Sequence, residues 1–453
     1  MTDPSQRSKT GKSPRRGLIA WAGALLVGIG SLAYFGYDLA GEPAFADESA
    51  YYSQSYFAKL FAQRKRDDPA WLEYMAFDLP PLPKYMIGAS LWEHGYPLPT
   101  ADQARAWYQN TSLRFDPPGG LAAAKRPFAM AGALGCVALY GIGVLAFGIR
   151  AGLVAGLFLT INPLYTLHAR RAMSDVPCEA FMLAALFVAL WSWKRWLKGS
   201  GWPIAAIAPI SVGALVGLAL LAKLSGTLAL IVIAAWAIVG CLAKSSGWRR
   251  LGNAVSCLAV PVATAAVFVA LNPFLTAHPK HPMPPNFAEI AAKSMVERAE
   301  MMFRLRLQVA ADQQRMFPHN ALHLPAEKVS VMAVQGFGRF GPFGPAESDS
   351  RNRFDLNQDR GGFIWLPCVG IGLIWALLRG WSERHAGDPP TAWAIAAYWI
   401  VGFTVVTAYL PMAWDRYMLS IQAPSALLAA GLLVATVDAL WGLTRPRPEG
   451  IDP

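Results

Sequence analysis

Long apolar runs separated by short polar stretches dominate the pattern of hydrophobic and polar positions along the chain. The first run covers about residues 18–36 and follows a polar, basic arm. Because a helix needs about 20 apolar residues to cross a bilayer, each run is a candidate transmembrane helix. Counted in this way, the pattern predicts about ten transmembrane helices. The other runs lie at about 128–147, 152–167, 177–193, 203–222, 226–242, 254–271, 363–379, 391–410 and 418–441.

The composition agrees with this pattern. Of the 453 residues, 54% are hydrophobic and only 15% are charged, whereas about a quarter of the residues are charged in soluble proteins. This balance excludes a disordered chain, a coiled coil and a soluble basic protein that binds nucleic acid, so we expect no nucleic-acid partner. The sequence therefore predicts an all-α polytopic membrane protein surrounded by membrane lipids.

Basic residues indicate how the helices are oriented. Lys and Arg number 40 against 29 Asp and Glu, and many of them stand in short loops between the apolar runs. Placing the N-terminal arm in the cytoplasm brings these basic loops to the same side, which predicts that both chain ends are cytoplasmic. Ala44-Phe45-Ala46 is similar to a signal-peptidase site, but the first run is longer than a signal sequence requires, so we expect an uncleaved anchor. The loop residues are Arg150, Lys194, Arg195, Lys198, Lys244, Arg249, Arg250, Arg379, Arg384, Arg445 and Arg447.

The predicted topology divides the chain into five parts, two of which are long segments on the outer face. In the second of these segments, Asn286 and Glu289 have the spacing of a capping box, and apolar residues then recur at helical spacing as far as Val309. We expect a helix on the membrane surface there, and further short surface helices in both segments. The parts are residues 1–36 (arm and first helix), 37–127 (first outer segment, with the candidate catalytic carboxylates), 128–272 (helices two to seven), 273–362 (second outer segment) and 363–453 (last three helices and tail).

Charged residues that the topology does not require gather on the outer side. A charged group at the edge of a membrane span must face water, a partner or a cavity. Asp47 and Glu48 follow the first helix, with Tyr51 and Tyr52 just after them. A carboxylate at this place can act as a general base that deprotonates an acceptor, and a solvated acidic pair is the alternative interpretation.

The first outer segment also contains Asp78, Pro80, Pro81 and Lys84. The two prolines predict an extended entry into a short helix that continues to Leu91. A rigid turn beside a surface helix is the expected structural role of this segment, whether or not it contacts substrate.

The turn between the third and fourth runs contains His168, Arg170, Arg171 and Asp175. Two arginines on the outer face oppose the usual distribution of positive charge in membrane proteins. Either one arginine binds a phosphate through its planar guanidinium while Asp175 holds it, or an Arg–Asp pair caps the helix ends.

Two further outer turns contribute Lys223 and Arg416. Lys223 lies between two apolar runs, where it either extends to the interface for topological reasons or binds an anionic head group. Arg416 stands between Asp415 and Tyr417, so a local ion pair with Asp415 is the alternative to phosphate binding. Together the outer-face residues describe one site with a carboxylate base, several cations and a membrane beside it. Such a site suits a substrate with a phosphate or pyrophosphate head and a lipid tail.

Neither a metal nor a soluble nucleotide is indicated. His278, His281, His319 and His323 lie in the second outer segment, but no carboxylate stands at a recognisable ligand spacing from them. We therefore expect no metal site and no cofactor. The sequence contains no P-loop and no dinucleotide-binding fingerprint, which disfavours a nucleotide donor on the cytoplasmic side.

An ordered set of motifs gives the chain a family resemblance. It resembles the GT-C membrane glycosyltransferases, in the branch of the protein O-mannosyltransferases and the lipid A aminoarabinose transferase, and this implies a GT-C-like helical bundle. The resemblance covers most of residues 37–226 and the final pair of spans. The motifs are Asp47-Glu48, Pro80-Pro81-Leu82, the turn from His168 to Pro177, the turn from Gly217 to Gly226 with Lys223, and Arg416-Tyr417 with Pro424.

The resemblance implies a polyprenyl-phosphate-linked sugar as donor, with transfer on the outer, periplasmic face of a bacterial inner membrane. It places acceptor activation on Asp47, with Glu48 as its neighbour, and leaves the acceptor open among lipid, glycan and protein. Family members commonly have a His before the Pro-Pro-Leu motif, where this chain has Asp78-Leu79. The donor phosphate is assigned to Arg170, Arg171, Lys223 and Arg416, and supporting roles to Tyr51, Tyr52, Asp78, Pro80, Pro81, Lys84, His168, Asp175 and Tyr417.

Two other classes of function stay open. A transporter or flippase for a lipid-linked sugar also needs cations near lipid, but it should show inverted repeats and charges near mid-membrane. A membrane scaffold without catalysis explains the spans but not the outer-face cations. The sequence thus favours a hexosyl- or pentosyltransferase.

Overall fold

The computed structural model describes residues 14–113, 116–197, 202–242, 247–279, 285–346 and 355–444. The regular elements in these ranges are helices, and the β-type pairing found there is one isolated bridge between Ala321 and Met412. Some residues used in the sequence predictions lie outside the described ranges, namely Lys198, Lys244, His281, Arg445, Arg447 and residues 1–13.

Each predicted apolar run corresponds to a helix or a helix pair. In the described ranges, seven helices are long and apolar enough to cross a membrane, or eight if one bent pair counts as a single span. Two shorter apolar helices, Ile207–Ala222 and Leu258–Ala270, belong to the runs at 203–222 and 254–271. The chain is therefore an all-α multi-pass membrane protein, as predicted. The bundle contains α1 (Pro14–Gly36), α7 (Gly120–Phe147), α8 (Ile149–Thr160), α9 (Pro163–Ala169), α10 (Asp175–Leu197), α11 (Trp202–Ala222), α12 (Thr227–Cys241), α13 (Gly247–Ala270), α19 (Gly362–His385), α20 (Thr391–Tyr409) and α21 (Leu419–Thr444).

The run at 152–167 is broken, which corrects the prediction of one continuous helix. α8 ends at Thr160, α9 begins at Pro163, and the two helices are bent by 66°. Pro163 has no N–H to continue the α8 hydrogen-bond ladder, and its fixed φ suits the first turn of a new helix, which favours a break before it. The Asn162 side chain then accepts a hydrogen bond from Tyr165 N (2.9 Å) and starts α9 as its N-cap. The bend turns the end of α9, with His168, into the outer end of the bundle.

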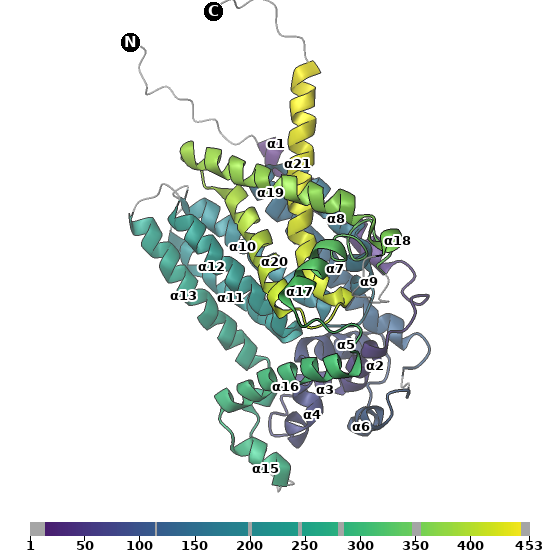
Figure 1. Cartoon of the computed structure of the whole chain (residues 1–453). Coiled ribbons are helices and arrows are strands. Elements are labelled where there is room, and N and C mark those ends of the chain that lie inside the picture. The colour runs from purple at the N-terminus through teal and green to yellow at the C-terminus, as the bar shows by residue number, and fades with distance from the viewer. Residues whose placement is uncertain are drawn as a thin grey trace, which may run out of the picture.

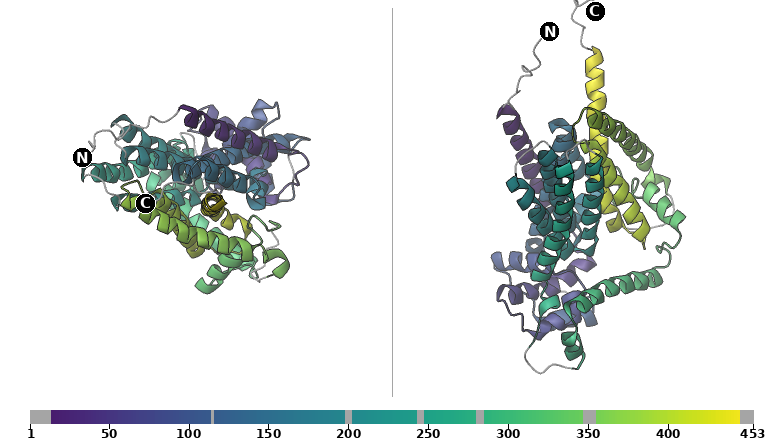
Figure 2. Two further views of the ribbon diagram at one scale, coloured as in Figure 1. Left: turned by 90° about the horizontal axis from the view of Figure 1, so that it is seen from above. Right: turned by 90° about the vertical axis from the view of Figure 1, so that its left-hand side faces the viewer.

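The two outer segments lie at the same end of the bundle. α7 contacts α1, α8 and α10, α11 packs between α10 and α13, and α21 packs against α8 and α19. Figure 1 and the side view in Figure 2 show that α1 begins and α21 ends at one end of the bundle. The helices of the first outer segment and α16 gather at the opposite end. The cytoplasmic placement of the former end stays a prediction.

The first outer segment is a cap of short helices with a small core of its own. Phe57 and Trp71 pack at its centre with their ring centroids 4.9 Å apart. Pro81 occupies the first turn of α5, where its missing N–H leaves no donor unsatisfied, so the predicted helix after the proline pair is confirmed. The elements are α2 (Ala46–Ser53), η2 (Gln54–Tyr56), α3 (Phe57–Ala62), η3 (Pro69–Leu72), α4 (Tyr74–Phe77), α5 (Pro81–Glu93) and α6 (Ala101–Gln109).

The second outer segment contains a long helix, α16, but its start differs from the prediction. A helix begins at Pro285, beside the predicted start at Asn286, but it ends at Ala292, so the predicted helix to Val309 is divided into α15 and α16. α16 starts with a capping box of its own, in which Ser294 N donates to Glu297 Oε2 (2.7 Å) and Glu297 N donates back to Ser294 Oγ (3.4 Å). The elements are α14 (Pro273–Thr276), α15 (Pro285–Ala292), α16 (Met295–Met316), α17 (Pro325–Val334) and α18 (Leu356–Asp359), while η4 (Leu224–Gly226) and η5 (Asp415–Met418) form the short outer turns.

α16 is fixed to the bundle near both of its ends. Near the start, the fully buried Arg298 guanidinium donates to the carbonyl oxygens of Phe274, Ala277, Ile290 and Ala291. Near the end, Gln314 Nε2 donates to the carbonyl oxygens of Leu322 and Pro411. α16 therefore links the outer end of α13, through α14, to the outer end of α20.

Candidate active site

Asp47 and Arg416 form an ion pair between the first outer segment and the short turn η5 that precedes α21. Asp47 is the second residue of α2, its side chain is 44% exposed, and Oδ2 accepts a hydrogen bond from Arg416 Nη1 at 2.8 Å. The guanidinium also lies over the Trp414 ring, 4.7 Å from its centroid. The alternative of a local pair between Asp415 and Arg416 is wrong, because Asp415 Oδ1 accepts only the backbone N–H of Arg416 (2.6 Å). The guanidinium is thus aimed at Asp47.

Lys223 and Asp175 form a second ion pair close by. Lys223 Nζ donates to Asp175 Oδ1 at 2.6 Å, and its ammonium lies 5.8 Å from the centroid of the Tyr417 ring. Asp175 opens α10 and is buried, whereas the Lys223 side chain is 27% exposed. The partly exposed lysine is thus anchored by a buried carboxylate.

His168 connects the two pairs. Its Nδ1 lies 4.0 Å from Asp175 Oδ2 and its Nε2 lies 3.5 Å from Asp415 Oδ2. The structure thereby brings together residues from α2, α9, α10, η4 and η5. We refer to Asp47, His168, Asp175, Lys223, Asp415 and Arg416 as the central cluster.

Tyr51 lies beside the central cluster, on the same face of α2 as Asp47. Its side chain is buried, and burial raises the pKa of the phenol, although a hydrogen bond with Ser174 acts in the opposite direction. Tyr51 therefore stays protonated and packs the cluster against the rest of the first outer segment.

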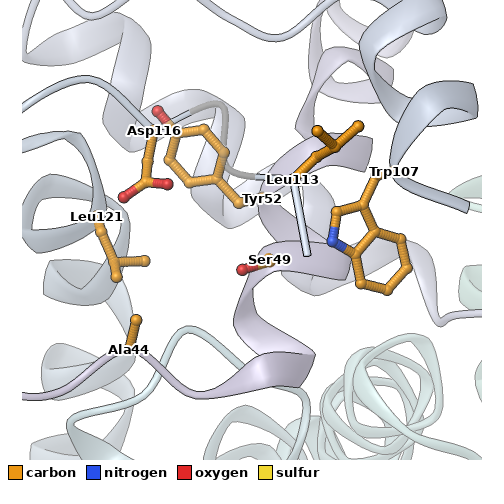
Figure 3. A pocket seen from close by; sticks show the side chains of 7 residues that line it. All are labelled: Ala44, Ser49, Tyr52, Trp107, Leu113, Asp116 and Leu121. Carbon is orange, nitrogen blue, oxygen red and sulfur yellow. The ribbon is translucent and has the colours of Figure 1, made fainter. Parts of the chain in front are cut away.

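Tyr52 faces away from the central cluster. At 100° per residue, Ser49 and Tyr52 lie on the side of α2 opposite Asp47. Figure 3 shows the Tyr52 ring in a separate small pocket with Trp107 and Asp116. The structure thus separates Tyr52 from the residues it was predicted to support.

Glu48 is buried in structural contacts, unlike Asp47. Its Oε2 accepts from Phe45 N (2.8 Å) at the start of α2, and its Oε1 accepts from Ala172 N (2.7 Å) in the turn after α9. The side chain is fully buried, which raises the pKa of the carboxyl, while Lys125 at 3.9 Å opposes that rise. A carboxylate with both oxygens bonded to backbone amides cannot reach an acceptor, so the geometry gives Glu48 a positioning role in place of the predicted catalytic one.

Arg170 is likewise used by the fold rather than by the central cluster. Its Nε donates to Glu42 Oε2 at 2.8 Å, and its Nη atoms donate to the carbonyl oxygens of Phe35, Tyr37 and Asp38. The guanidinium therefore fixes the chain that leaves α1. This geometry argues against the predicted phosphate-binding role, because the donors of Arg170 are already engaged.

Arg171 differs from Arg170 in having few partners. Its guanidinium lies over the Phe45 ring, 4.1 Å from the centroid. Its Nε and Nη1 are buried without a hydrogen-bond partner among the described residues. Arg171 belongs to the charged group around Glu48, Glu42 and Lys125, not to the central cluster.

Asp78 and Lys84 form a buried pair at the start of α5. Lys84 Nζ lies 3.8 Å from Asp78 Oδ1, and both side chains are nearly inaccessible. Burial raises the pKa of Asp78 to about 6 and lowers the pKa of Lys84 to about 7, with each partner opposing the shift of the other. Pro80 and Pro81 fix the turn between them.

Arg306 on α16 is a further candidate that was not among the site residues predicted from the sequence. Met302 and Arg306 follow Arg298 at intervals of four residues, so the three side chains share one face of α16. Arg298 and Met302 are buried, and Arg306 is half-buried. The Arg306 charge reaches Tyr51, Asp78 and Lys84. The helical period of the buried face was the signal that could have identified it.

Two buried carboxylates were also missed as site residues. Asp415 was considered only as a local partner of Arg416, yet it faces His168. Glu179 lies one turn after Asp175 on α10, where its side chain contacts Tyr398 and Ser420. An ionisable residue inside a span is a recognised sign of a functional region.

Within the described residues, no group of three or more His, Cys, Asp or Glu side chains is arranged to hold a metal ion. Of the four histidines of the second outer segment, His281 lies outside the described ranges.

Comparisons with known proteins identify the fold. No protein-family model matches the sequence, and no curated protein sequence matches it. The archaeal oligosaccharyltransferase AglB from Archaeoglobus fulgidus, in complex with an inhibitory peptide and a dolichol-phosphate, matches with a TM-score of 0.56 at 14% identity, over 96% of this chain and 53% of AglB. ArnT from Cupriavidus metallidurans in the apo state matches with a TM-score of 0.51 at 18% identity, over 94% of this chain and 61% of ArnT.

These likenesses cover nearly the whole of this chain, which spans about half the length of AglB. At such low sequence identity they show the fold and leave the chemistry to the residues of the site. The chain has the helical architecture of the GT-C membrane glycosyltransferases, as its motif order suggested.

Proposed function

We propose that the chain is a membrane glycosyltransferase that moves a sugar from a polyprenyl-phosphate donor to an acceptor on the outer, periplasmic face of a bacterial inner membrane. The observation that carries the proposal is the central cluster, in which the half-exposed Asp47 carboxylate lies beside two partly exposed cations, Lys223 and Arg416. A base and a phosphate-binding pair next to apolar spans are the groups that this reaction needs.

In the proposed reaction, Asp47 accepts the proton of the acceptor O–H or N–H. The acceptor atom forms a bond to the anomeric carbon, and the bond from that carbon to the phosphate oxygen breaks with its electron pair on the phosphate. Lys223 and Arg416 stabilise the charge that develops on the leaving polyprenyl phosphate. Attack opposite the leaving group inverts the anomeric centre.

The geometry supports Lys223 and Arg416 over Arg170 as phosphate ligands. Both are partly exposed, and each is held by one carboxylate that leaves further N–H donors available. Arg306 is a third candidate, because it approaches the same region from α16. Arg171 retains donors but lies over Phe45, in the charged group around Glu48 and Lys125, so we assign it a secondary role.

The fold supports a lipid-linked donor. The AglB structure of the same architecture holds a dolichol-phosphate, which is a lipid phosphate of the proposed class. The proposal covers hexosyl and pentosyl donors. It also covers lipid, glycan and protein acceptors, because the choice of sugar and of acceptor depends on groups outside the central cluster.

The experiment uses the full-length protein in lipid nanodiscs, with polyprenyl-phosphate sugars labelled in the sugar. Release of polyprenyl phosphate with transfer of label is the expected result. Asp47→Asn should reduce turnover by about 10²–10⁴-fold, as expected for loss of a general base, and Asp102→Asn is the matched control because Asp102 is 90% exposed on α6. Uptake of intact donor into vesicles without cleavage would support the transporter alternative instead.

A further inference from the structure

The ring of His168 lies between the carboxylates of Asp175 and Asp415. Asp175 pairs with Lys223, and Asp415 accepts a hydrogen bond from the backbone of Arg416. Asp175 uses Oδ1 to accept from Lys223 Nζ, and its Oδ2 faces His168 Nδ1 at 4.0 Å. Asp415 uses Oδ1 to accept from the backbone N–H of Arg416, and its Oδ2 faces His168 Nε2 at 3.5 Å. Asp175 is thus shared between the Lys223 ammonium and the ring, whereas Asp415 bonds the backbone N–H of its neighbour and directs Oδ2 toward the ring. Among the described residues, both ring nitrogens and Asp415 Oδ2 are buried without a hydrogen-bond partner, so the ring faces the two acids at ion-pair distance.

The placement of both ring nitrogens determines which form of histidine fits. Neutral imidazole carries one N–H and one lone pair, so one of its nitrogens would turn a lone pair toward a carboxylate oxygen. The imidazolium carries an N–H at both positions and is attracted to both acids. His168 is 2% exposed, so no solvent reaches the ring to compensate for a repulsive contact.

The balance of charges around the ring also favours the imidazolium. The three carboxylates of the central cluster face only two permanent cations, and an imidazolium brings the cluster to neutrality. An anionic donor would otherwise approach a cluster with an excess negative charge. The titratable and charged groups around His168 are Asp175 and Glu179 on α10, Lys223 before η4, Asp415, Arg416 and Tyr417 on η5, and Asp47 on α2.

We infer that His168, as the imidazolium, bridges Asp175 and Asp415 and thereby fixes the spacing of Lys223 and Arg416. The inference rests on the proposed function, because it specifies how that site holds its phosphate-binding cations. His168 is a positioning residue, since its burial keeps it from touching substrate. When the ring loses its proton, one arm of the bridge becomes repulsive and the two cations lose their common support.

The first test reads the protonation state directly and needs no activity. NMR of the full-length protein labelled with ¹⁵N-histidine is recorded with and without His168→Gln, and the signal lost in the variant belongs to His168. We expect a signal in which both nitrogens are protonated near neutral pH. A signal typical of a neutral tautomer under the same conditions would overturn the inference.

The second test measures binding of a polyprenyl phosphate in nanodiscs as a function of pH. Wild-type affinity should fall as pH rises through the range in which histidine titrates. His168→Gln, which keeps hydrogen-bonding capacity but not the charge, should bind about tenfold more weakly at low pH and lose this pH dependence, with kcat at saturating donor changed far less. His385→Gln, at the far end of α19, is the control. Wild-type affinity and pH profile in His168→Gln would overturn the inference.

A further variant tests the bridge in case His168→Gln does not fold. Asp415→Asn keeps the histidine but removes one arm of the bridge, and it should show the same loss of affinity. In the double variant the loss should be no greater than in either single variant, because both remove one bridge. If the losses of affinity of the two single variants add in the double variant, the bridge between His168 and Asp415 is contradicted. If the wild-type protein binds no polyprenyl phosphate, the proposed function fails, whereas the NMR result still decides the bridge.

Discussion

The ammonium of Lys223 and the carboxylate of Asp175 lie 2.6 Å apart, and 48 positions separate them in the sequence. Asp175 begins a long span and is buried, so it provides a rigid support for a side chain that is partly exposed. A rigid support leaves little conformational freedom to be lost when an anion binds, which favours tight binding.

Replacement of Lys223 by Met should weaken donor binding while leaving the fold intact. A charge-assisted hydrogen bond contributes about 1.5–3 kcal/mol, so the KM for the donor should rise about tenfold or more. Titration of the donor at saturating acceptor gives this value. Arg150→Ala is the matched control, since Arg150 pairs with Asp438 at the other end of the bundle and is 70% exposed. Equal donor KM values in both variants would argue against Lys223 as a ligand.

Arg416 should be the more sensitive of the two cations, because it also orients Asp47. Arg416→Ala should raise the donor KM and lower kcat together, whereas Arg416→Lys should keep part of the binding and lose the geometry of the guanidinium. Steady-state kinetics at two salt concentrations separate these effects, since loss of a phosphate contact reduces the dependence on salt. A change in kcat alone would restrict Arg416 to the orientation of Asp47.

Arg306 and Arg304 provide a matched pair on one helix. Arg304 pairs with Glu300 and is 76% exposed, while Arg306 faces Tyr51 and the Asp78–Lys84 pair. Arg306→Ala should raise the donor KM about fivefold, which corresponds to about 1 kcal/mol, and Arg304→Ala should have no effect. Equal donor KM values for the two variants would contradict the placement of Arg306 in the site.

Arg170 should matter for stability and not for catalysis. Its guanidinium joins Glu42 to the chain that leaves α1, so Arg170→Ala should lower the unfolding free energy by about 1–3 kcal/mol. Thermal unfolding in detergent checks this, and the donor KM of the surviving folded protein should match wild type. A large rise in KM with unchanged stability would restore the phosphate-binding assignment.

Asp78→Asn should make stability depend on pH in a defined direction. Without Asp78, Lys84 is buried and unpaired, and its pKa should fall below the value of about 7 that it has beside the carboxylate. The unfolded chain then binds a proton that the folded chain does not, up to the ordinary lysine pKa of about 10.4, so the free energy of unfolding rises with pH across this range.

Measured at neutral pH, the loss in Asp78→Asn should be about 3–5 kcal/mol, as for a broken buried ion pair. Asp78→Asn combined with Lys84→Met should recover much of it, because no unpaired charge remains. Chemical unfolding at several pH values distinguishes the cases. Stability of the single variant that decreases with rising pH would contradict the assignment of the buried charge to Lys84.

The helical bundle could be predicted from the sequence because the bilayer requires long apolar runs. The same topology predicted that Lys223 and Arg416 lie at one end of the bundle, where the structure brings them together; the side of the membrane stays a prediction. Which cation pairs with which acid could not be predicted, since that depends on the approach of distant segments. The sequence alone makes Arg170 and Arg416 equally good candidates for phosphate binding. In the structure, however, Arg170 donates to backbone carbonyl groups, whereas Arg416 donates to Asp47. Glu48 and Asp47 are neighbours, and only the helix direction separates a buried acid from an exposed one.

The bond between Asp47 and Arg416 has a consequence for the synthesis of the protein. The two residues are 369 positions apart, and ribosomes add about 5–20 residues per second. Arg416 is therefore synthesised roughly 20–70 s after Asp47, while the intervening helices enter the membrane. Until the final hairpin of α20 and α21 is inserted, a nascent chain lacks the cation that pairs with the Asp47 carboxylate. Under the proposed function, the protein is expected to be inactive during its own biogenesis and to become active only in the last step of its assembly.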